Sequence, residues 1–295
     1  PWSDANVQHL AVSWRLVGAP EASHQTAAVG PWPYPRAEEY RIGAVYALRF
    51  VSVDQDARTV TVQPGSWELN EALRIPADYQ LIMGPGTTLD IAPGGGIVSR
   101  GPVRLLGDAD APVVLRGGGL AIVEALETSL LQYVLFERAG GAHIDGSALP
   151  GALTLLGSAA ELVDCEFSDT GAASALHLFA SDVRAARLGI TGLRNADPRD
   201  PEASGALRVV ASALDGTDVQ VTGVDGAALS AGQGSTVTLN GLVATSCAVG
   251  VVGASGARVE ARNVSLVKCR QDTIVFGDAT LILDGVPPVA ARGTR

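Results

Sequence analysis

Residues 205–270 consist of three copies of one short unit, and this repeat constrains the fold more than any other feature of the chain. The copies read GALRVVASALDGTDVQVTGVDG (205–226), AALSAGQGSTVTLNGLVATSCA (227–248) and VGVVGASGARVEARNVSLVKCR (249–270). Leu214, Val237 and Val259 occupy equivalent positions, which shift by 23 and then by 22 residues. A fixed period of this size is typical of stacked supersecondary units rather than of a single globular core.

The same period can be followed upstream, to about residue 68. Ile75 matches Ile97 and Leu81 matches Val103, each pair being 22 residues apart. Short alternating segments recur there, separated by Gly, Pro and Asp, which favour bends. Hydrophobic residues make up 47% of the chain and aromatic residues only 5%, a balance that suits many short strands with a core of Val, Leu, Ile and Ala.

We therefore predict an all-β fold, a single-stranded right-handed parallel β-helix with coils of about 22 residues. Each strand is expected to pair with the equivalent strand one coil further on, which satisfies the backbone along the axis. Side-chain alternation predicts an inward column of Phe136, Phe167, Ile190, Val221, Ala244 and Leu266. A second column is predicted at bends, where Asp, Asn and Gly suit left-handed backbone and Arg187 is the exception: Asp164, Arg187, Asp218, Gly241 and Asn263.

Three regions follow from this pattern: an N-terminal cap region (1–58), the parallel β-helix (59–285) and a C-terminal tail (286–295). A solenoid needs an atypical end unit that covers the open edge and the apolar face of its first coil. An aromatic-rich segment fits that role, and the alternative is a platform on which sugar rings stack. All four tryptophans fall within the first 67 residues: Trp2, Trp14, Trp32 and Trp67.

The formal net charge is −10 and the isoelectric point is near 4.8, which argues against a nucleic acid or an anionic membrane as partner. No apolar run reaches the roughly 18–20 residues that span a bilayer. We find no phosphate-binding glycine motif and no metal-type Cys/His spacing, so no cofactor and no metal are expected. Because the chain begins at Pro1 rather than Met, we expect that a signal peptide or other segment has been removed.

Two of the three cysteines, Cys247 and Cys269, lie one period apart. Their positions on neighbouring coils would place their Cα atoms about 4.8 Å apart, within reach of a disulfide. The alternative is two small buried side chains stacked in one column.

The segments LRIPADYQLIMGPGTTLDI, GPVRLLGDADAPVVL and LQYVLFE resemble the β-helix segment of CotH-type (spore-coat kinase-like) exported bacterial proteins. The resemblance covers about residues 60–285 and extends more broadly to the pectin-lyase-like superfamily, whose members cleave, epimerise or bind polysaccharides. It implies a β-helix fold without kinase activity, because the chain has no kinase domain. Relatives carry acidic residues at the coil openings, where this chain has Ala173, Ser174 and His177.

One outward column of polar residues is the strongest candidate site. Thr154, His177, Arg208 and Ser230 each lie between inward apolar neighbours, at spacings of 23, 31 and 22 residues, of which the 31 includes the insertion 193–204. Two loops, 141–150 and 193–204, flank this column. The catalytic candidates are His177, Arg208, His143 and Asp145, and the substrate-binding candidates are Thr154, His177, Arg199, Arg208 and Ser230. An arginine could pair with a uronate carboxylate and a histidine could transfer protons, whereas the alternative is an ordinary solvated face.

Other acidic residues are weaker candidates. Asp108 and Asp110 fall in a Gly-Asp-Ala-Asp sequence that is typical of a turn. Asp164 and Glu166 are two residues apart on a predicted strand, so both are expected to face outward. Such a pair could act in acid–base chemistry or bind a hard cation, or it could be purely structural.

The sequence thus predicts a non-catalytic β-helix protein, exported by a bacterium to the periplasm, the cell surface or the medium. It would bind or scaffold a polysaccharide or an envelope protein, with no membrane span, and could be a module of a larger protein or assembly. The alternative is a lyase, epimerase or hydrolase acting on an acidic polysaccharide around Thr154–Arg208. Whether the protein is an enzyme stays open at this point, and the absence of a compact catalytic set favours binding.

Overall fold

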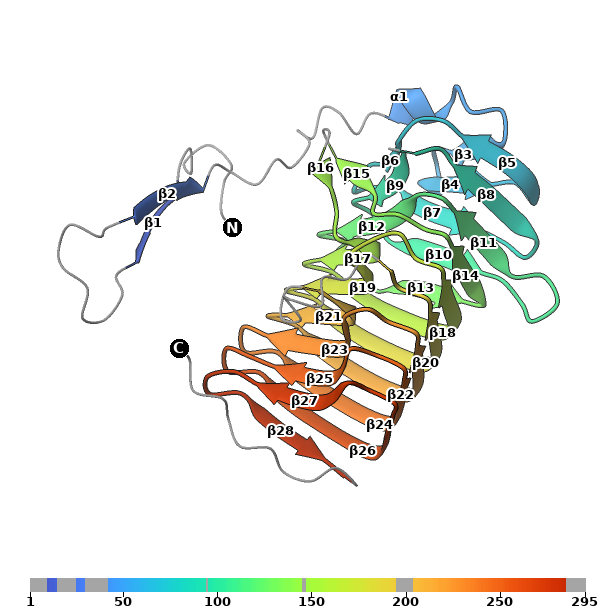
Figure 1. Cartoon of the computed structure of the whole chain (residues 1–295). Helices are drawn as coiled ribbons and strands as arrows, with labels where there is room; N and C mark the ends of the chain where they lie inside the picture. The colour runs from blue at the N-terminus through green and yellow to red at the C-terminus, as the bar shows by residue number, and fades with distance from the viewer. Residues whose placement is uncertain are drawn as a thin grey trace.

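The computed structural model describes residues 10–14, 25–29, 42–93, 95–144, 147–194 and 204–284. Within these ranges nearly all regular structure is β-strand, and the one helix, α1 (Ile42–Val45), is a single turn. Parallel strands stack coil upon coil into a β-solenoid of about nine turns (Figure 1). The all-β, parallel solenoid architecture predicted from the repeat is confirmed.

One wall of the solenoid is a sheet of nine parallel strands, one from each turn, which we call the nine-strand sheet. In chain order its strands are β6 (Leu73–Ile75), β9 (Gly96–Ser99), β12 (Gly119–Val123), β17 (Gly151–Leu156), β19 (Ser174–Phe179), β21 (Gly205–Val210), β23 (Ala227–Gly232), β25 (Val249–Gly253) and β27 (Gln271–Val275). Leu176 pairs with Leu207 and Leu207 pairs with Leu229, although the first pair is separated by a longer stretch of chain. The extra residues between β19 and β21 therefore leave the register intact.

The remaining walls belong to one larger sheet with two limbs, which we call the bent sheet. In the first turns each limb has its own strands. The first limb holds β4 (Thr59–Val62), β7 (Gln80–Met83), β10 (Val103–Leu106) and β13 (Ser129–Gln132). The second limb holds β5 (Gly65–Leu69), β8 (Thr87–Ile91), β11 (Val113–Arg116) and β14 (Val134–Glu137).

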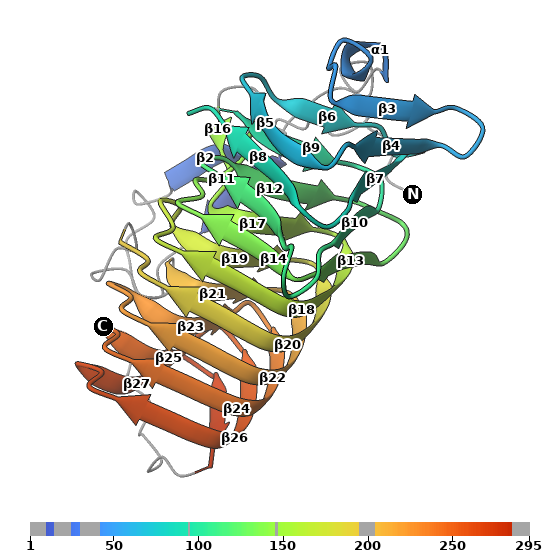
Figure 2. The ribbon, with the colours of Figure 1, turned by 90° about the vertical axis from the view of Figure 1, so that its right-hand side faces the viewer.

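In the later turns a single ten-residue strand spans both limbs of the bent sheet (Figure 2). These strands are β18 (Ala159–Ser168), β20 (Asp182–Thr191), β22 (Ala213–Thr222), β24 (Thr236–Thr245) and β26 (Arg258–Val267). The sheet ends with β28 (Thr280–Leu283), which covers only the first limb of β26. Three strand pairs are antiparallel: β3 (Val51–Asp54) with β4 at the edge of the bent sheet, β1 (Leu10–Trp14) with β2 (Gln25–Val29), and β15 (His143–Ile144) with β16 (Ser147–Ala148).

Each ten-residue strand bends at one residue in left-handed backbone conformation, and these residues form the predicted bend column. The φ angles are 53° at Asp164, 54° at Arg187, 54° at Asp218, 91° at Gly241 and 53° at Asn263. Such a residue interrupts the alternation of side chains, so that apolar residues of both limbs point inward. The bend column is confirmed, and it includes Arg187, although a residue with a Cβ adopts this conformation at a cost of about 1–2 kcal/mol.

The core follows the predicted inward column along the second limb. Phe136, Phe167, Ile190, Val221 and Ala244 are all at most 1% exposed. The rings of Phe136 and Phe167 stack with their centroids 4.5 Å apart. Leu266 points the same way but is only half-buried, and no described strand covers it, because β28 pairs with the first limb of β26 alone.

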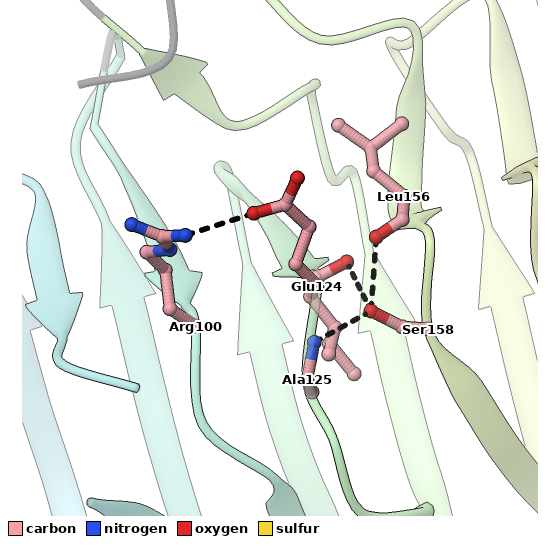
Figure 3. A network of polar contacts seen from close by, with 6 residues as sticks. Arg100, Glu124, Ala125, Leu156 and Ser158 are labelled. Atoms are coloured by element: carbon pink, nitrogen blue, oxygen red, sulfur yellow. Dashed lines mark hydrogen bonds and ion pairs between the residues drawn. The ribbon is translucent and has the colours of Figure 1, made fainter. Parts of the chain in front are cut away.

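The corner that leads from the nine-strand sheet into the first limb of the bent sheet carries a ladder of serine hydroxyls. The Ser158 hydroxyl oxygen accepts a hydrogen bond from the Ala125 N–H (3.1 Å) and donates to the Leu156 carbonyl (3.0 Å; Figure 3). The backbone N–H of Ser158 in turn donates to the hydroxyl of Ser181 at 3.2 Å. The pattern continues through Ser212 and Ser235, with N–H to hydroxyl distances of 3.0 and 3.4 Å. These hydroxyls satisfy corner N–H groups that would otherwise be buried without an acceptor.

The N-terminal end of the solenoid is covered in part by described residues of the predicted cap region. Phe50, just before β3, stacks on Trp67 with ring centroids 5.6 Å apart. The other three tryptophans lie outside the residues whose side chains are described. Within the described ranges, no helix has the length and apolar character needed to cross a bilayer.

Candidate functional site

Strand register brings the predicted polar column together on the outer face of the nine-strand sheet. Thr154 pairs with His177, His177 with Arg208 and Arg208 with Ser230. The column continues to Val252. These residues are therefore neighbours, since the longer stretch of chain between β19 and β21 does not shift the register.

This column is not a solvated face. Thr154, Ser230 and Val252 each have 0% exposure. The Thr154 hydroxyl accepts a hydrogen bond from the Gly151 N–H at 3.1 Å, and the Ser230 hydroxyl accepts one from the Arg208 guanidinium at 3.0 Å. The interpretation of an ordinary solvated surface thus fails for the threonine and the serine, whose hydroxyls are committed to partners within the protein.

Apolar packing also covers the outer face on both sides of the polar residues. Towards the N-terminus, Ala142 and Leu149 pack on the face in a small cluster with four residues of the sheet: Val98, Ala121, Val123 and Leu156. Towards the C-terminus, Val252 packs with Ala227, Ala248, Val249 and Ile274. The outer face of the nine-strand sheet is therefore partly a second core, in which the polar column is embedded.

His177 shows the electrostatic consequence of this burial. Its pKa is lowered to about 4, first by burial and second by the positive charge of Arg208. Its Nδ1 atom is buried and makes no hydrogen bond with another described residue. The imidazole is accordingly neutral at pH 7. Because its protonated form has so low a pKa, the neutral ring is a weak general base.

The remaining sequence candidates are not placed beside this column. His143 belongs to β15, but only its backbone is described, and Asp145 and Arg199 lie outside the described residues. The predicted cluster is therefore represented by Thr154, His177, Arg208 and Ser230 alone. In the described part of the chain, no three His, Cys, Asp or Glu side chains gather in a way that could hold a metal ion.

A second surface, on the outside of the bend column, is hollowed into an open groove of about 750 Å³. The bend residues Tyr133, Asp164, Arg187 and Asp218 form one side of it. The second limbs of β18, β20 and β22 supply the other side. Residues of the turn around Asp108 also line the groove, so its lining joins residues from several coils.

Gly189 keeps this groove open. It occupies the outward position between Glu166 and Gln220 in the register of the second limb. A Cβ atom at Gly189 would come no closer than 3.6 Å to the Glu166 side chain, so the empty space there could hold a larger residue. Because the middle strand has no side chain at this position, space is left between the side chains of Glu166 and Gln220.

The groove is acidic. Asp108, Asp164, Glu166 and Asp218 line it, with Arg187 as the only basic lining residue in the described chain. The Arg187 guanidinium donates to both Asp164 carboxylate oxygens, at 2.5 and 2.7 Å. This hydrogen bonding lowers the pKa of Asp164 and raises the pKa of Arg187. Asp164 therefore stays ionised, and Glu166 makes no ion pair or hydrogen bond with another described residue.

Two sequence expectations concern residues of this groove. Asp164 and Glu166 both face outward, as their spacing predicted, but Asp164 sits at the bend and Glu166 on the second limb. The Asp108 carboxylate accepts hydrogen bonds from the N–H groups of Asp110 (3.0 Å) and Ala111 (2.7 Å), which confirms its turn role. The groove as a whole was missed, and the available signal was Gly189 at an outward strand position.

Comparison with known proteins adds no family to this description, since no family model, no curated protein and no solved structure matches the chain.

Proposed function

We propose that this parallel solenoid is a non-catalytic binding protein that holds a polysaccharide chain in the groove along its bend column. The observation that carries the proposal is the open, polar groove of about 750 Å³, which contrasts with the occluded column on the nine-strand sheet. Successive coils are about 4.8 Å apart. A linear polymer lying along the axis would therefore cross one coil about every 4.8 Å and pass Glu166, Gly189 and Gln220 in turn.

The chemistry of the lining favours a neutral or amino-sugar polymer over a polyuronate. Four carboxylates face one arginine, which is already paired with Asp164, so a polymer of carboxylates would be repelled. Glu166 and Gln220 supply hydrogen-bond acceptors and donors for sugar hydroxyls or ammonium groups. Tyr133 offers an aromatic body with a polar tip, which suits the mixed surface of a sugar ring.

Catalysis around Thr154–Arg208, the alternative from the sequence, has less support. That column lacks an exposed hydroxyl, and the low pKa of His177 suits neither a general acid nor a general base near pH 7. The Arg208 guanidinium already donates to Ser230, whereas the uronate hypothesis needed this group for a substrate carboxylate. We therefore keep His177 and Arg208 as positions of interest but place the ligand at the bend.

The proposal includes export by a bacterium to the periplasm, the cell surface or the medium, where polysaccharides and envelope proteins are found. It also includes kinship with pectin-lyase-like β-helices and with the CotH-type segment. The support for these finer statements is the parallel solenoid together with the quoted sequence segments.

Affinity electrophoresis in gels containing a chitosan, a neutral glucan or a polyuronate tests the proposal. We expect retardation by one of the first two polymers, and Gly189→Trp should weaken it at least tenfold (about 1.4 kcal/mol) by filling the groove. Thr238→Trp, at an exposed position on the first limb, is the matched control. Retardation by the polyuronate alone, or equal effects of both variants, would contradict the groove assignment, and release of shortened polymer would support the enzymatic alternative.

A further inference from the structure

The cysteines Cys247 and Cys269 are stacked on neighbouring coils at the corner between the second limb and the nine-strand sheet. On one side of them Thr245 pairs with Val267, and on the other Val249 pairs with Gln271. The Arg270 N–H donates to the Cys247 carbonyl at 3.1 Å, which holds the two corners together. In-register positions on adjacent coils are about 4.8 Å apart, inside the Cα range of a disulfide.

The two thiols are free, and they differ in exposure. Cys247 is 2% exposed, whereas Cys269 is only half-buried. The pKa of Cys247 is raised to about 11, first by burial and then by the neighbouring Cys269 thiol, so the side chains are close enough to interact. The third cysteine, Cys165, is buried in an earlier coil, and its pKa is raised to about 12 by burial.

We propose that Cys247 and Cys269 form a dithiol modification site that closes to a disulfide and clamps the last two coils together. With hydrogen peroxide as oxidant, the Cys269 sulfur attacks one peroxide oxygen, the O–O bond breaks, and a sulfenic acid and one water form. The Cys247 sulfur then attacks the Cys269 sulfur, the S–O bond breaks, and the thiol proton leaves with the hydroxyl as a second water. Two thiols are oxidised and one peroxide is reduced.

The clamp would act beside the second limb of β26, whose apolar residues are incompletely buried. Val264 and Leu266, on the second limb of β26, are half-buried, whereas the equivalent Leu242 and Ala244 of β24 have 0% exposure. Among the described strands none covers the second limb of β26, because β28 pairs only with its first limb. A covalent link at the end of this limb would restrain local opening of the terminal coil.

The experiment treats the folded protein with hydrogen peroxide or diamide, followed by thiol labelling and peptide mapping under non-reducing conditions. We expect loss of two thiols, a linked pair of peptides containing Cys247 and Cys269, and a free Cys165. Cys269→Ser should abolish the link and Cys165→Ser should leave it unchanged. Loss of all three thiols at one rate, links between molecules only, or no thiol loss would each overturn the proposal.

Amide hydrogen exchange tests whether the disulfide, once formed, restrains local opening of the last two coils. Amides of β26 and β27 should exchange at least tenfold more slowly in the oxidised protein than in the reduced protein, while those of β12 stay unchanged. Equal exchange of β26 and β27 in both states would overturn the clamp. Neither readout depends on the bend groove or on any polysaccharide, so the two proposals fail independently.

Discussion

The outer face of the nine-strand sheet and the outer side of the bend are built from the same coils, yet they have opposite characters. On the sheet, Thr154 and Ser230 point away from the central core and still have no exposed surface. At the bend, Glu166 and Gln220 point away from the same core and line an open groove. Strand alternation therefore determines which side of a sheet a residue occupies, whereas exposure depends on what else packs on that side.

This difference separates a polar column that is structural from one that is available to a ligand. Hydroxyls of the occluded column are bonded within the protein, and its histidine is held neutral. The groove keeps carboxylates in contact with solvent, and only one of them is committed to a strong ion pair. Four predictions probe the contrast, in order of decreasing expected effect.

Introducing the same large cation on each surface gives the largest expected difference. Thr154→Arg should lower the free energy of unfolding by roughly 3–5 kcal/mol, because a buried site must accept a long charged side chain. Gln220→Arg should change it by no more than about 0.5 kcal/mol. Urea titration followed by circular dichroism measures both. Similar losses for the two variants would show that the groove is as closed as the sheet face.

The pH dependence of stability tests the burial of His177. Its pKa in the folded protein is about 4 against an ordinary 6.5, so between these values the unfolded chain binds more protons. Stability should then fall as the pH falls from 6.5 to 4, by up to about 3 kcal/mol from this group. His177→Gln removes the titration, and its curve should be flatter than that of the unmodified protein. Parallel curves would mean that the imidazole is solvated.

The serine ladder at the corner where the two sheets meet offers a smaller effect. Ser181→Ala removes the acceptor of the Ser158 N–H and should cost about 1–3 kcal/mol, since that buried donor is left without a partner. Ser265→Ala, at an exposed strand position, is the control and should be nearly neutral. Thermal unfolding measures both changes. A neutral Ser181→Ala would indicate that water replaces the hydroxyl.

Removing the Arg187–Asp164 ion pair of the groove should have the smallest effect on stability, so the pKa of Asp164 is the better quantity to measure. Arg187→Gln should raise the pKa of Asp164, because hydrogen bonding by the guanidinium is the main cause of its depression. Arg184→Gln, on the first limb, should leave that pKa unchanged. Carboxyl titration by nuclear magnetic resonance distinguishes the two. An unchanged pKa of Asp164 in the Arg187→Gln variant would contradict the bidentate geometry.

The periodic part of the molecule could be predicted from the sequence, because each period repeats the same local requirement. The inward column from Phe136 to Ala244 and the bends at Asp164 and Asp218 follow from alternation and from the residues that tolerate left-handed backbone. Arg187 broke the residue pattern, and its pairing with Asp164 one coil earlier supplies a compensating interaction.

Features that depend on more than the period could not be predicted. The groove needs Gly189 and a turn around Asp108, which are far apart in the sequence and belong to no repeated pattern. Burial of Thr154 and Ser230 depends on packing outside the coil, which alternation does not encode. Ser158, Ser181, Ser212 and Ser235 recur at spacings of 23, 31 and 23 residues, but serine alone does not distinguish a buried corner from a solvated turn.

The three corners of the coil differ in how much variation in length they tolerate. At the bend a single residue turns the strand in the later turns, as at Asp218, although residues 107–112 separate β10 from β11 in an earlier turn. The described connections that lead from the nine-strand sheet into the first limb are short. The third corner leads from the second limb back to the nine-strand sheet. Its connection is short between β24 and β25, but long segments follow β14 and β20 without loss of register. Evolution and protein engineering therefore have one edge along which the longest segments can be inserted and displayed, while the connections at the other two edges are shorter.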